Sequence, residues 1–155
     1  MYREMRRKAK ETDISQSIRI LENGEYGILS TIDSNNQPYG IPLSYVLKDN
    51  LLYFHCASEG HKIDNINFED KVSFCVVGET QIQPSKFTTK YESVIVFGKA
   101  EVLEDSSEKK KALLYLCEKY SPDFLEEANV YIDKALEKTT VFRIKIEHIS
   151  GKENK

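Results

Sequence analysis

The sequence has no strong excess of charge of either sign. It carries 22 lysines and arginines against 25 aspartates and glutamates among 155 residues, a net charge of −3. Because proteins bind nucleic acid largely by neutralising phosphates with basic side chains, this balance argues against a nucleic-acid partner. The chain also has no apolar run long enough for a signal sequence or a membrane span. We therefore expect a cytoplasmic protein without a membrane partner.

Cysteine and histidine are scarce as well. Cys56, Cys75 and Cys117 are too far apart in sequence for a zinc cluster, and their odd number argues against a disulfide framework. The three histidines show neither an HExxH motif nor paired metal-ligand spacing, so no metal site is expected. A GxGxxG motif after a strand is also missing, which leaves NAD(P)H as at most a transient electron donor.

The chain contains no internal repeat, low-complexity block or linker rich in proline and glycine. Its length of 155 residues and its hydrophobic content of 40% suffice for one core but not for two. We therefore expect a single domain over residues 1–155.

Local patterns predict mainly strands with flanking helices. Asp13 and Asp105 are suited to cap helices, and Ser121 followed by Pro122 predicts the start of another. Alternating apolar residues and turn chemistry predict strands over residues 26–32, 39–47, 51–55, 71–77, 91–103 and 140–149. This order favours a meandering antiparallel sheet of six strands in a mainly β (α+β) fold, arranged as a barrel or as layers.

Residues 53–62 form the most unusual stretch for chemistry. A strand ends there, small residues and Gly60 follow, and His61 and Lys62 stand at the start of a predicted helix. A helix start offers unpaired N–H groups and a partial positive charge, so it could hold a phosphate. The spacing does not match a Walker A loop. A surface turn with a solvated lysine is the alternative interpretation.

Pro42 marks a second candidate segment, because proline cannot donate a hydrogen bond within a strand ladder. It predicts an edge strand or irregular pairing, which would leave backbone groups free for a flat ligand. An ordinary edge strand with no ligand is the simpler interpretation of this pattern.

Four segments together resemble a known family: residues 27–31, 38–46, 53–62 and 91–100. They are similar to the pyridoxamine 5′-phosphate oxidase-like flavoproteins, and more narrowly to the nitroimidazole-resistance (Nim-type) branch. The resemblance extends over almost the whole chain, including residues 5–8 and 149–152. It implies an FMN-binding split β-barrel that forms a homodimer with FMN at the subunit interface.

The resemblance also implies a set of cofactor-binding residues. They would be Pro42, Leu43, Ser44, Tyr45, His55, Cys56, Ala57, Ser58, His61, Lys62 and Tyr91. Within this set, Ser58, His61 and Lys62 would surround the phosphate. His55 would face the flavin ring as the candidate catalytic residue, although a half-buried strand histidine is usually only hydrogen-bonded.

Two members of the set carry further alternatives. Tyr91 could cover a flavin bound to the partner subunit or could simply pack, and Cys56 is interpreted as structural. Gly60-His61 replaces the Ser-Arg of true pyridoxamine phosphate oxidases, whose C-terminal substrate-binding segment also has no counterpart before Lys155. Oxidation of pyridoxamine phosphate is therefore not the expected activity.

The leading hypothesis is an FMN-dependent oxidoreductase that acts on a small molecule, with nitro-compound reduction as the suggested subclass. Two alternatives stay open: a non-catalytic protein that stores or senses flavin, and a split-barrel relative that binds haem or deazaflavin.

Overall fold

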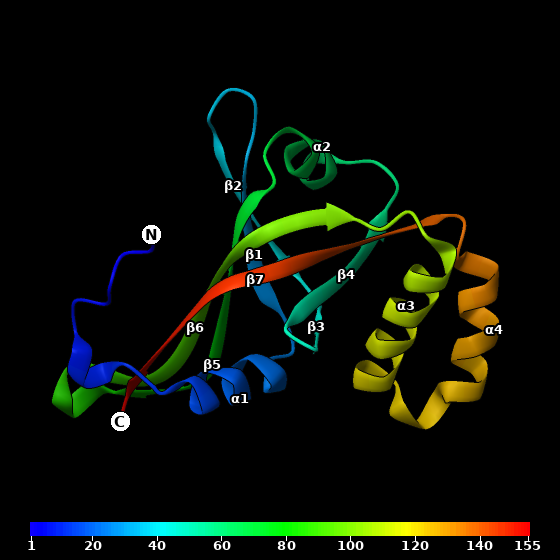
Figure 1. The fold of residues 1–155 in the computed structure, drawn as a ribbon. Coiled ribbons are helices and arrows are strands. Elements are labelled where there is room, and N and C mark those ends of the chain that lie inside the picture. The colour runs from blue at the N-terminus through cyan, green and yellow to red at the C-terminus, as the bar shows by residue number, and fades with distance from the viewer.

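The computed structural model describes all 155 residues and is built around one antiparallel sheet (Figure 1). Seven strands lie in the order β2-β1-β5-β6-β7-β4-β3. Their bounds are Gly27–Ile32 for β1, Pro38–Leu43 for β2, Val46–Lys48 for β3, Leu51–Ala57 for β4, Lys71–Gln83 for β5, Thr88–Val102 for β6 and Thr139–Asn154 for β7. The predicted mainly β, split-barrel fold class is confirmed, but the predicted count of six strands is wrong.

The extra strand arises because the segment predicted as one strand over residues 39–47 is divided in two. β2 pairs with β1 and β3 pairs with β4, so these consecutive strands lie at opposite edges of the sheet. Only Ser44 and Tyr45 separate them. Since three residues of extended chain span at most about 11 Å, the two edges must approach each other at this point. The sheet is therefore curled, and the Ser44–Tyr45 crossing joins its edges.

Four α-helices accompany the sheet: α1 Ile14–Asn23, α2 His61–Phe68, α3 Ser106–Tyr120 and α4 Leu125–Ala135. The predicted caps of α1 and α3 are confirmed, because Asp13 accepts from Gln16 N at 2.8 Å and Asp105 accepts from Glu108 N at 3.1 Å. Ser121 and Pro122 start a helical segment as predicted, with Ser121 at the N-cap and Pro122 at the first position, but the Ser121 side chain makes no capping hydrogen bond. A 3₁₀ turn with a Phe124 N to Ser121 O bond intervenes, so α4 begins at Leu125.

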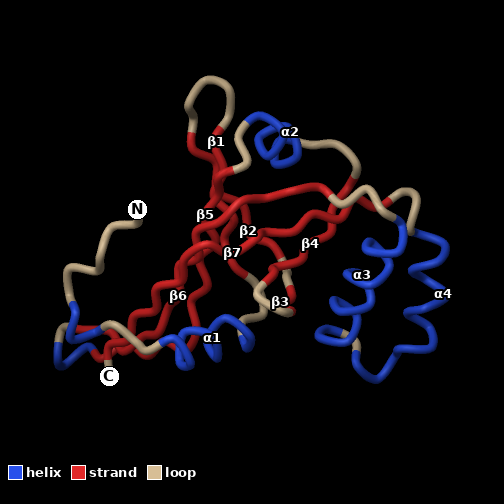
Figure 2. The backbone as a smooth tube through the Cα atoms, viewed as in Figure 1, coloured by secondary structure: helices blue, strands red, loops and turns tan.

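Two apolar clusters lie on opposite sides of β4. The larger, which we call the barrel core, has 16 buried residues and includes Tyr45, Phe54, Phe74 and Phe142. Phe54 stacks on Phe142 with ring centroids 4.7 Å apart. The smaller, which we call the helix-side cluster, consists of Tyr53, Leu103, Ala112, Leu113, Leu116, Ile132 and Val141. Helices α3 and α4 contribute Ala112, Leu113, Leu116 and Ile132 to this second cluster, and they run as an antiparallel pair (Figure 2).

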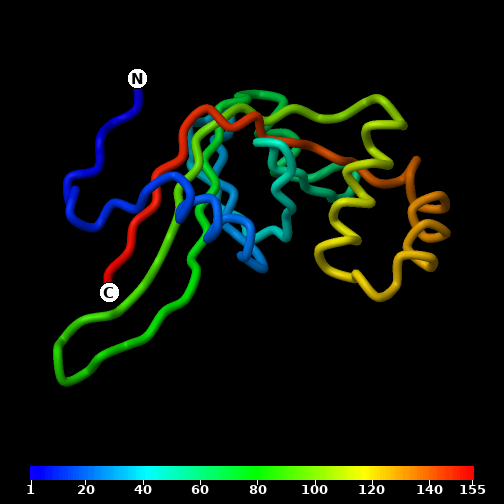
Figure 3. The backbone as a smooth tube through the Cα atoms, turned by 60° about the horizontal axis from the view of Figure 1, so that its bottom comes forward, coloured from blue at the N-terminus to red at the C-terminus, as the bar shows by residue number.

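The β5–β6 hairpin projects away from the rest of the chain (Figure 3). It carries exposed apolar side chains at Ile82 and Phe87, and Phe87 adopts a positive φ of 51° at the turn. None of the helices combines the length and apolar character that crossing a bilayer requires.

Candidate functional site

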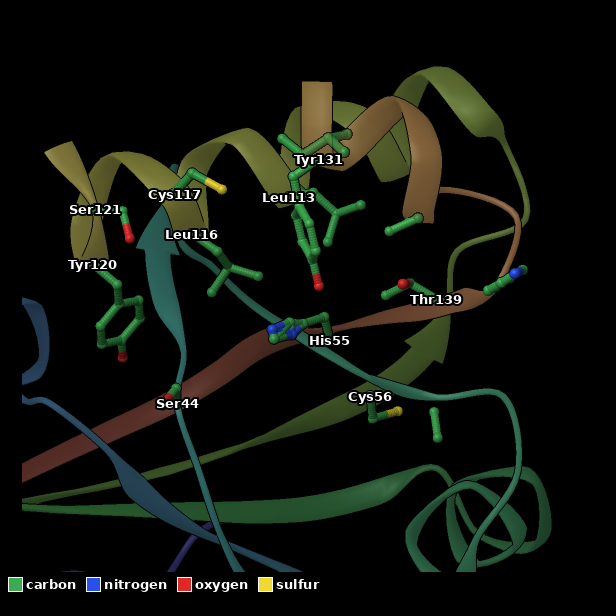
Figure 4. A pocket seen from close by; sticks show the side chains of 14 residues that line it. Ser44, His55, Cys56, Leu113, Leu116, Cys117, Tyr120, Ser121, Tyr131 and Thr139 are labelled. Atoms are coloured by element: carbon green, nitrogen blue, oxygen red, sulfur yellow. The ribbon is translucent and has the colours of Figure 1, made fainter. Parts of the chain in front are cut away.

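A cavity of about 680 Å³ opens between β4 and the α3–α4 pair (Figure 4). Its lining is mostly apolar and comes from the crossing, from β4, from both helices and from the start of β7. These residues are Ser44, His55, Cys56, Ala57, Leu113, Leu116, Cys117, Tyr120, Ser121, Tyr131, Ile132, Ala135, Lys138 and Thr139. Four of the predicted site residues, Ser44, His55, Cys56 and Ala57, are thus brought together.

Strand alternation explains how β4 presents its side chains. Phe54 points into the barrel core, so its neighbours Tyr53 and His55 point to the other face, toward the helices. β4 pairs with β7 along its full length, with Phe54 opposite Phe142 and His55 opposite Val141. This pairing holds the strand in place as one wall of the cavity.

His55 is chemically available in this wall. Its imidazole makes no hydrogen bond to another residue, and desolvation by the surrounding protein lowers the pKa of His55 below its ordinary value. The imidazole is therefore neutral near pH 7, with one nitrogen able to donate a hydrogen bond and the other able to accept one.

The two cavity thiols are poor nucleophiles. Burial raises the pKa of Cys117, and it raises the pKa of Cys56 despite the opposing positive charge of Lys62. Since the thiolate is the reactive form, both side chains stay protonated near neutral pH. This agrees with the structural interpretation of Cys56, and Lys62 is close enough to β4 for its charge to act there.

The start of α2 differs from the starts of α1 and α3 in having no side-chain cap. Gly60 occupies the N-cap position with φ at 144°, and no side chain accepts from the first turn. The N–H groups of Ile63 and Asp64 donate to Gly60 O, while those of His61 and Lys62 have no acceptor. Lys62 is half-buried and lies within 4.0 Å of no carboxylate. An anion could therefore be held here by N–H groups, the helix dipole and one ammonium group.

The side chain of His61 is directed elsewhere. Its ring lies on Tyr39 with centroids 4.0 Å apart, and its Nε2 is 4.0 Å from a carboxylate oxygen of Asp33. The residue stands at the start of α2 as expected, but its imidazole packs against the β1–β2 hairpin. Ser58 is exposed in the loop that leads from β4 to this helix.

The crossing residues divide between core and cavity. Tyr45 is fully buried and its hydroxyl donates to Leu21 O, so its side chain belongs to the barrel core rather than to the cavity. Ser44 is exposed, and no hydrogen bond joins its backbone N–H or C=O to another residue. Pro42 and Leu43 end β2, which is an edge strand as predicted from Pro42. The free backbone at this point is therefore that of Ser44.

Tyr91 lies apart from the cavity within a single chain. It is on β6 opposite Asn154 of β7, and Lys152 Nζ is 5.5 Å from the centre of its ring. It does not line the cavity, so a ligand bound in the cavity of the same chain would not be covered by Tyr91.

Several cavity residues were not anticipated from the sequence. The apolar stripe of α3 predicts that Leu113, Leu116 and Cys117 are buried, but not that they face β4. Tyr131 on α4 and Lys138 after it also line the cavity. No local signal distinguishes these two from surface residues, because their role depends on how the α3–α4 pair packs.

Comparison with known proteins places the chain in a family. A family model described as pyridoxamine 5′-phosphate oxidase matches residues 13–153. This chain belongs to the pyridoxamine 5′-phosphate oxidase-like family. Among curated proteins, none matches the chain significantly.

Solved structures support the family fold. A proposed 5-nitroimidazole antibiotic resistance protein from Bacteroides thetaiotaomicron is 23% identical, with a TM-score of 0.79 over 91% of this chain and 84% of that one. The flavocytochrome Anf3 from Azotobacter vinelandii is 19% identical, with a TM-score of 0.84 over 98% of this chain and 72% of that one. An FAD-binding protein from Mesorhizobium loti is 24% identical, with a TM-score of 0.66 over 94% and 98% of the two chains.

Proposed function

We propose that this member of the pyridoxamine 5′-phosphate oxidase-like family is an FMN-dependent oxidoreductase that acts on a small molecule, with nitro-compound reduction as its subclass. Two solved structures of the same fold support a flavin, since one is an FAD-binding protein and one is a flavocytochrome. A third, linked to nitroimidazole resistance, supports the subclass. The proposal itself depends on residues of this chain.

The observation that carries the proposal is the continuity between the cavity and the start of α2. β4 forms a cavity wall with His55, Cys56 and Ala57, and after three intervening residues the uncapped helix begins with His61 and Lys62. A flat ring in the cavity and a phosphate at the helix start would thus be served by one short segment. FMN has this combination of a flat ring and one terminal phosphate.

The chain's groups match the polar requirements of such a ligand. A volume of about 680 Å³ lies within the range of about 300–1,000 Å³ that is typical of small-molecule sites. The unpaired N–H and C=O of Ser44 would meet the polar edge of the ring, and Lys62, with Ser58 and the free N–H groups, would meet the phosphate.

Bound FMN would supply the electron-transfer chemistry, and the chain would orient the reactants and exclude water. Neutral His55 would donate a hydrogen bond from its one N–H group to a substrate atom that becomes negative. Leu113, Leu116 and Ile132 would shield that atom from water, which strengthens the contact with His55.

The charge of the cavity indicates a substrate class. No aspartate or glutamate lines it, and Lys138 is the one lining side chain with a full charge. Such a site favours molecules that are neutral or anionic and disfavours cations. A nitroaromatic compound fits this description, because its oxygens gain negative charge on reduction.

We further propose that the protein is a homodimer. On the outer face of the sheet, the pairs Pro42–Ile28, Ile28–Cys75 and Cys75–Ile95 place four residues in one row across neighbouring strands. Ile28 and Ile95 are 37% and 40% exposed, and Val77 on the same face of β5 is 58% exposed. Covering this apolar face by a second copy would bury it, and Tyr91 could then reach the partner's flavin.

Haem binding is a second candidate, favoured by the imidazole of His55, which makes no hydrogen bond and is exposed in the wall of a mostly apolar cavity. A protein from Mycobacterium smegmatis that binds both FAD and haem has the same fold, with a TM-score of 0.83.

Reconstitution of ligand-free protein tests these alternatives. We expect one FMN to bind per chain, with quenching of its fluorescence on binding. The loaded protein should turn over a nitroaromatic with NAD(P)H, and light scattering should give twice the chain mass. Binding without turnover would indicate a storage or sensing protein. A Soret band with haemin and no FMN binding would favour the haem candidate, and binding of neither would overturn the proposal.

A further inference from the structure

The C-terminal end of α3 is fastened to the crossing by Lys119. Its ammonium group donates to Gly24 O at 2.7 Å and to Tyr45 O at 2.9 Å, and it lies 3.8 Å from the centre of the Tyr45 ring. One side chain thus bridges the turn after α1 and the crossing between β2 and β3.

Tyr120 reinforces the same connection. Its hydroxyl accepts from Tyr45 N at 2.9 Å and lies 2.6 Å from Glu25 O and 2.9 Å from Tyr45 O. A side chain at Gly24 is excluded, because a Cβ there would collide with the Tyr45 hydroxyl oxygen. Both the N–H and the C=O of Tyr45 are therefore held by neighbouring residues of one helix.

This connection lies next to the cavity. Ser44, whose backbone is unpaired, directly precedes Tyr45, and both Ser44 and Tyr120 line the cavity. The position of the Ser44 backbone therefore depends on how Tyr45 is held.

We propose that Lys119 is a positioning residue, whose ammonium group holds the Ser44–Tyr45 crossing and so sets the polar wall of the cavity for ligand binding. This inference rests on the proposed flavin function only for the identity of the ligand, and the contacts of Lys119 stand independently of it.

The surroundings of Lys119 indicate a role beyond stability. No carboxylate lies within 4.0 Å of its nitrogen, and burial lowers the pKa of Lys119 to about 8. The ionisable groups around it are Tyr45 and Tyr120 in contact, and Glu22, Glu25 and Tyr26 across the adjoining cleft. Burial raises the pKa of Tyr45 well above its ordinary range, so its ring remains neutral under Lys119. Burying the Lys119 ammonium group without a counter-ion costs desolvation free energy on folding, and an apolar side chain at this position would avoid that desolvation cost.

Stability and ligand binding should consequently respond to pH in opposite directions. Because the pKa of Lys119 is lower in the folded chain, at about 8, than its ordinary value of 10.5, the unfolded chain holds more protons between these values. The contribution of Lys119 to stability therefore rises with pH across this window. Ligand binding should weaken across pH 8, because loss of the charge weakens the two carbonyl bonds and removes the cation–π contact.

The experiment compares wild type, Lys119→Met and the control Lys109→Met. Lys109 is on the same helix and also donates to a backbone carbonyl, that of Leu136 at 2.8 Å, but away from the crossing. FMN is titrated into ligand-free protein at pH 7 and pH 9, thermal unfolding is recorded, and exchange of the Tyr45 amide is followed by NMR at constant pH.

For Lys119→Met we expect FMN affinity at pH 7 to fall about tenfold, the change that one charge-assisted hydrogen bond explains. The decrease in FMN affinity that wild type shows between pH 7 and pH 9 should be absent from this variant. Hydrogen exchange of the Tyr45 amide should accelerate, and the melting temperature should not fall. Lys109→Met should keep wild-type affinity and pH dependence. Unchanged Tyr45 exchange, or affinity and pH dependence equal to wild type, would overturn the role of Lys119. Accelerated exchange in a protein that binds no FMN would support the positioning role and refute only the proposed flavin function.

Discussion

The two sides of β4 show how differently one strand can be used. On one side, Phe54 and Leu52 are fully buried in the barrel core, where aromatic rings stack and meet edge to face. On the other side, Tyr53 belongs to a cluster of seven residues that borders a cavity, and His55 faces the open space. Packing is complete on the first side and incomplete on the second. Stability should therefore come mainly from the barrel core, and the ligand site that we propose lies at the seam between β4 and the α3–α4 pair.

The largest effect is expected from Phe54→Ala. The ring has no exposed surface and contacts both Phe74 and Phe142, so its loss leaves a void that a rigid sheet cannot fill. We expect the free energy of unfolding to drop by about 3–5 kcal/mol. Denaturant titration measures this drop, and a loss below about 1 kcal/mol, the level of a conservative core change, would show that the barrel core is not the main source of stability.

Leu116→Ala should have a smaller effect, since its side chain lies in the helix-side cluster and already borders the cavity. We expect a loss of about 2 kcal/mol, the low end for such truncations, because the α3–α4 pair can adjust. The same denaturant titration compares the two variants directly. A loss equal to that of Phe54→Ala would contradict the distinction between a sealed side and an open side.

His55→Gln tests the chemistry of the open side. We expect turnover to fall by roughly 100-fold, a typical value for loss of one hydrogen-bond donor to a developing negative charge, while FMN affinity stays within a few-fold of wild type. Because the pKa of His55 is lowered, any acid limb that it causes in the pH–rate profile should lie below its ordinary value of 6.5. His148→Gln is the matched control, because His148 lies on β7 against Tyr2 and outside the cavity. Equal losses in the two variants would remove the case for His55.

Local chemistry accounts for the features of the fold that could be predicted. The caps at Asp13 and Asp105 and the alternation of β4 follow from residues a few positions apart. The division of residues 39–47 into β2 and β3 could not be seen this way, because the segment keeps its alternation while its partners change from β1 to β4. The partners of an edge strand are set by the sheet as a whole.

The site shows the same limit. His55 to Ala57 and Lys62 could be selected because they are close in sequence and carry recognisable chemistry. Tyr131 and Lys138 could not, because only the packing of α4 brings them to the cavity. Tyr45 was predicted from the sequence to lie at the site, but its side chain is buried in the barrel core. At the crossing, only the backbone of Ser44 is free of hydrogen bonds.

The central claim is that Lys62 and the uncapped start of α2 hold the phosphate of a ligand whose ring occupies the cavity. The most direct measurement is the titration of FMN and riboflavin into ligand-free wild type, Lys62→Ala and the control Lys71→Ala, an exposed lysine on β5. A charge-assisted hydrogen bond contributes about 1.5–3 kcal/mol, so Lys62→Ala should weaken FMN binding by roughly tenfold to a hundredfold. Riboflavin, which has no phosphate, should bind all three proteins with nearly the same affinity. Equal losses for FMN and riboflavin in Lys62→Ala, or no loss for either, would contradict the account.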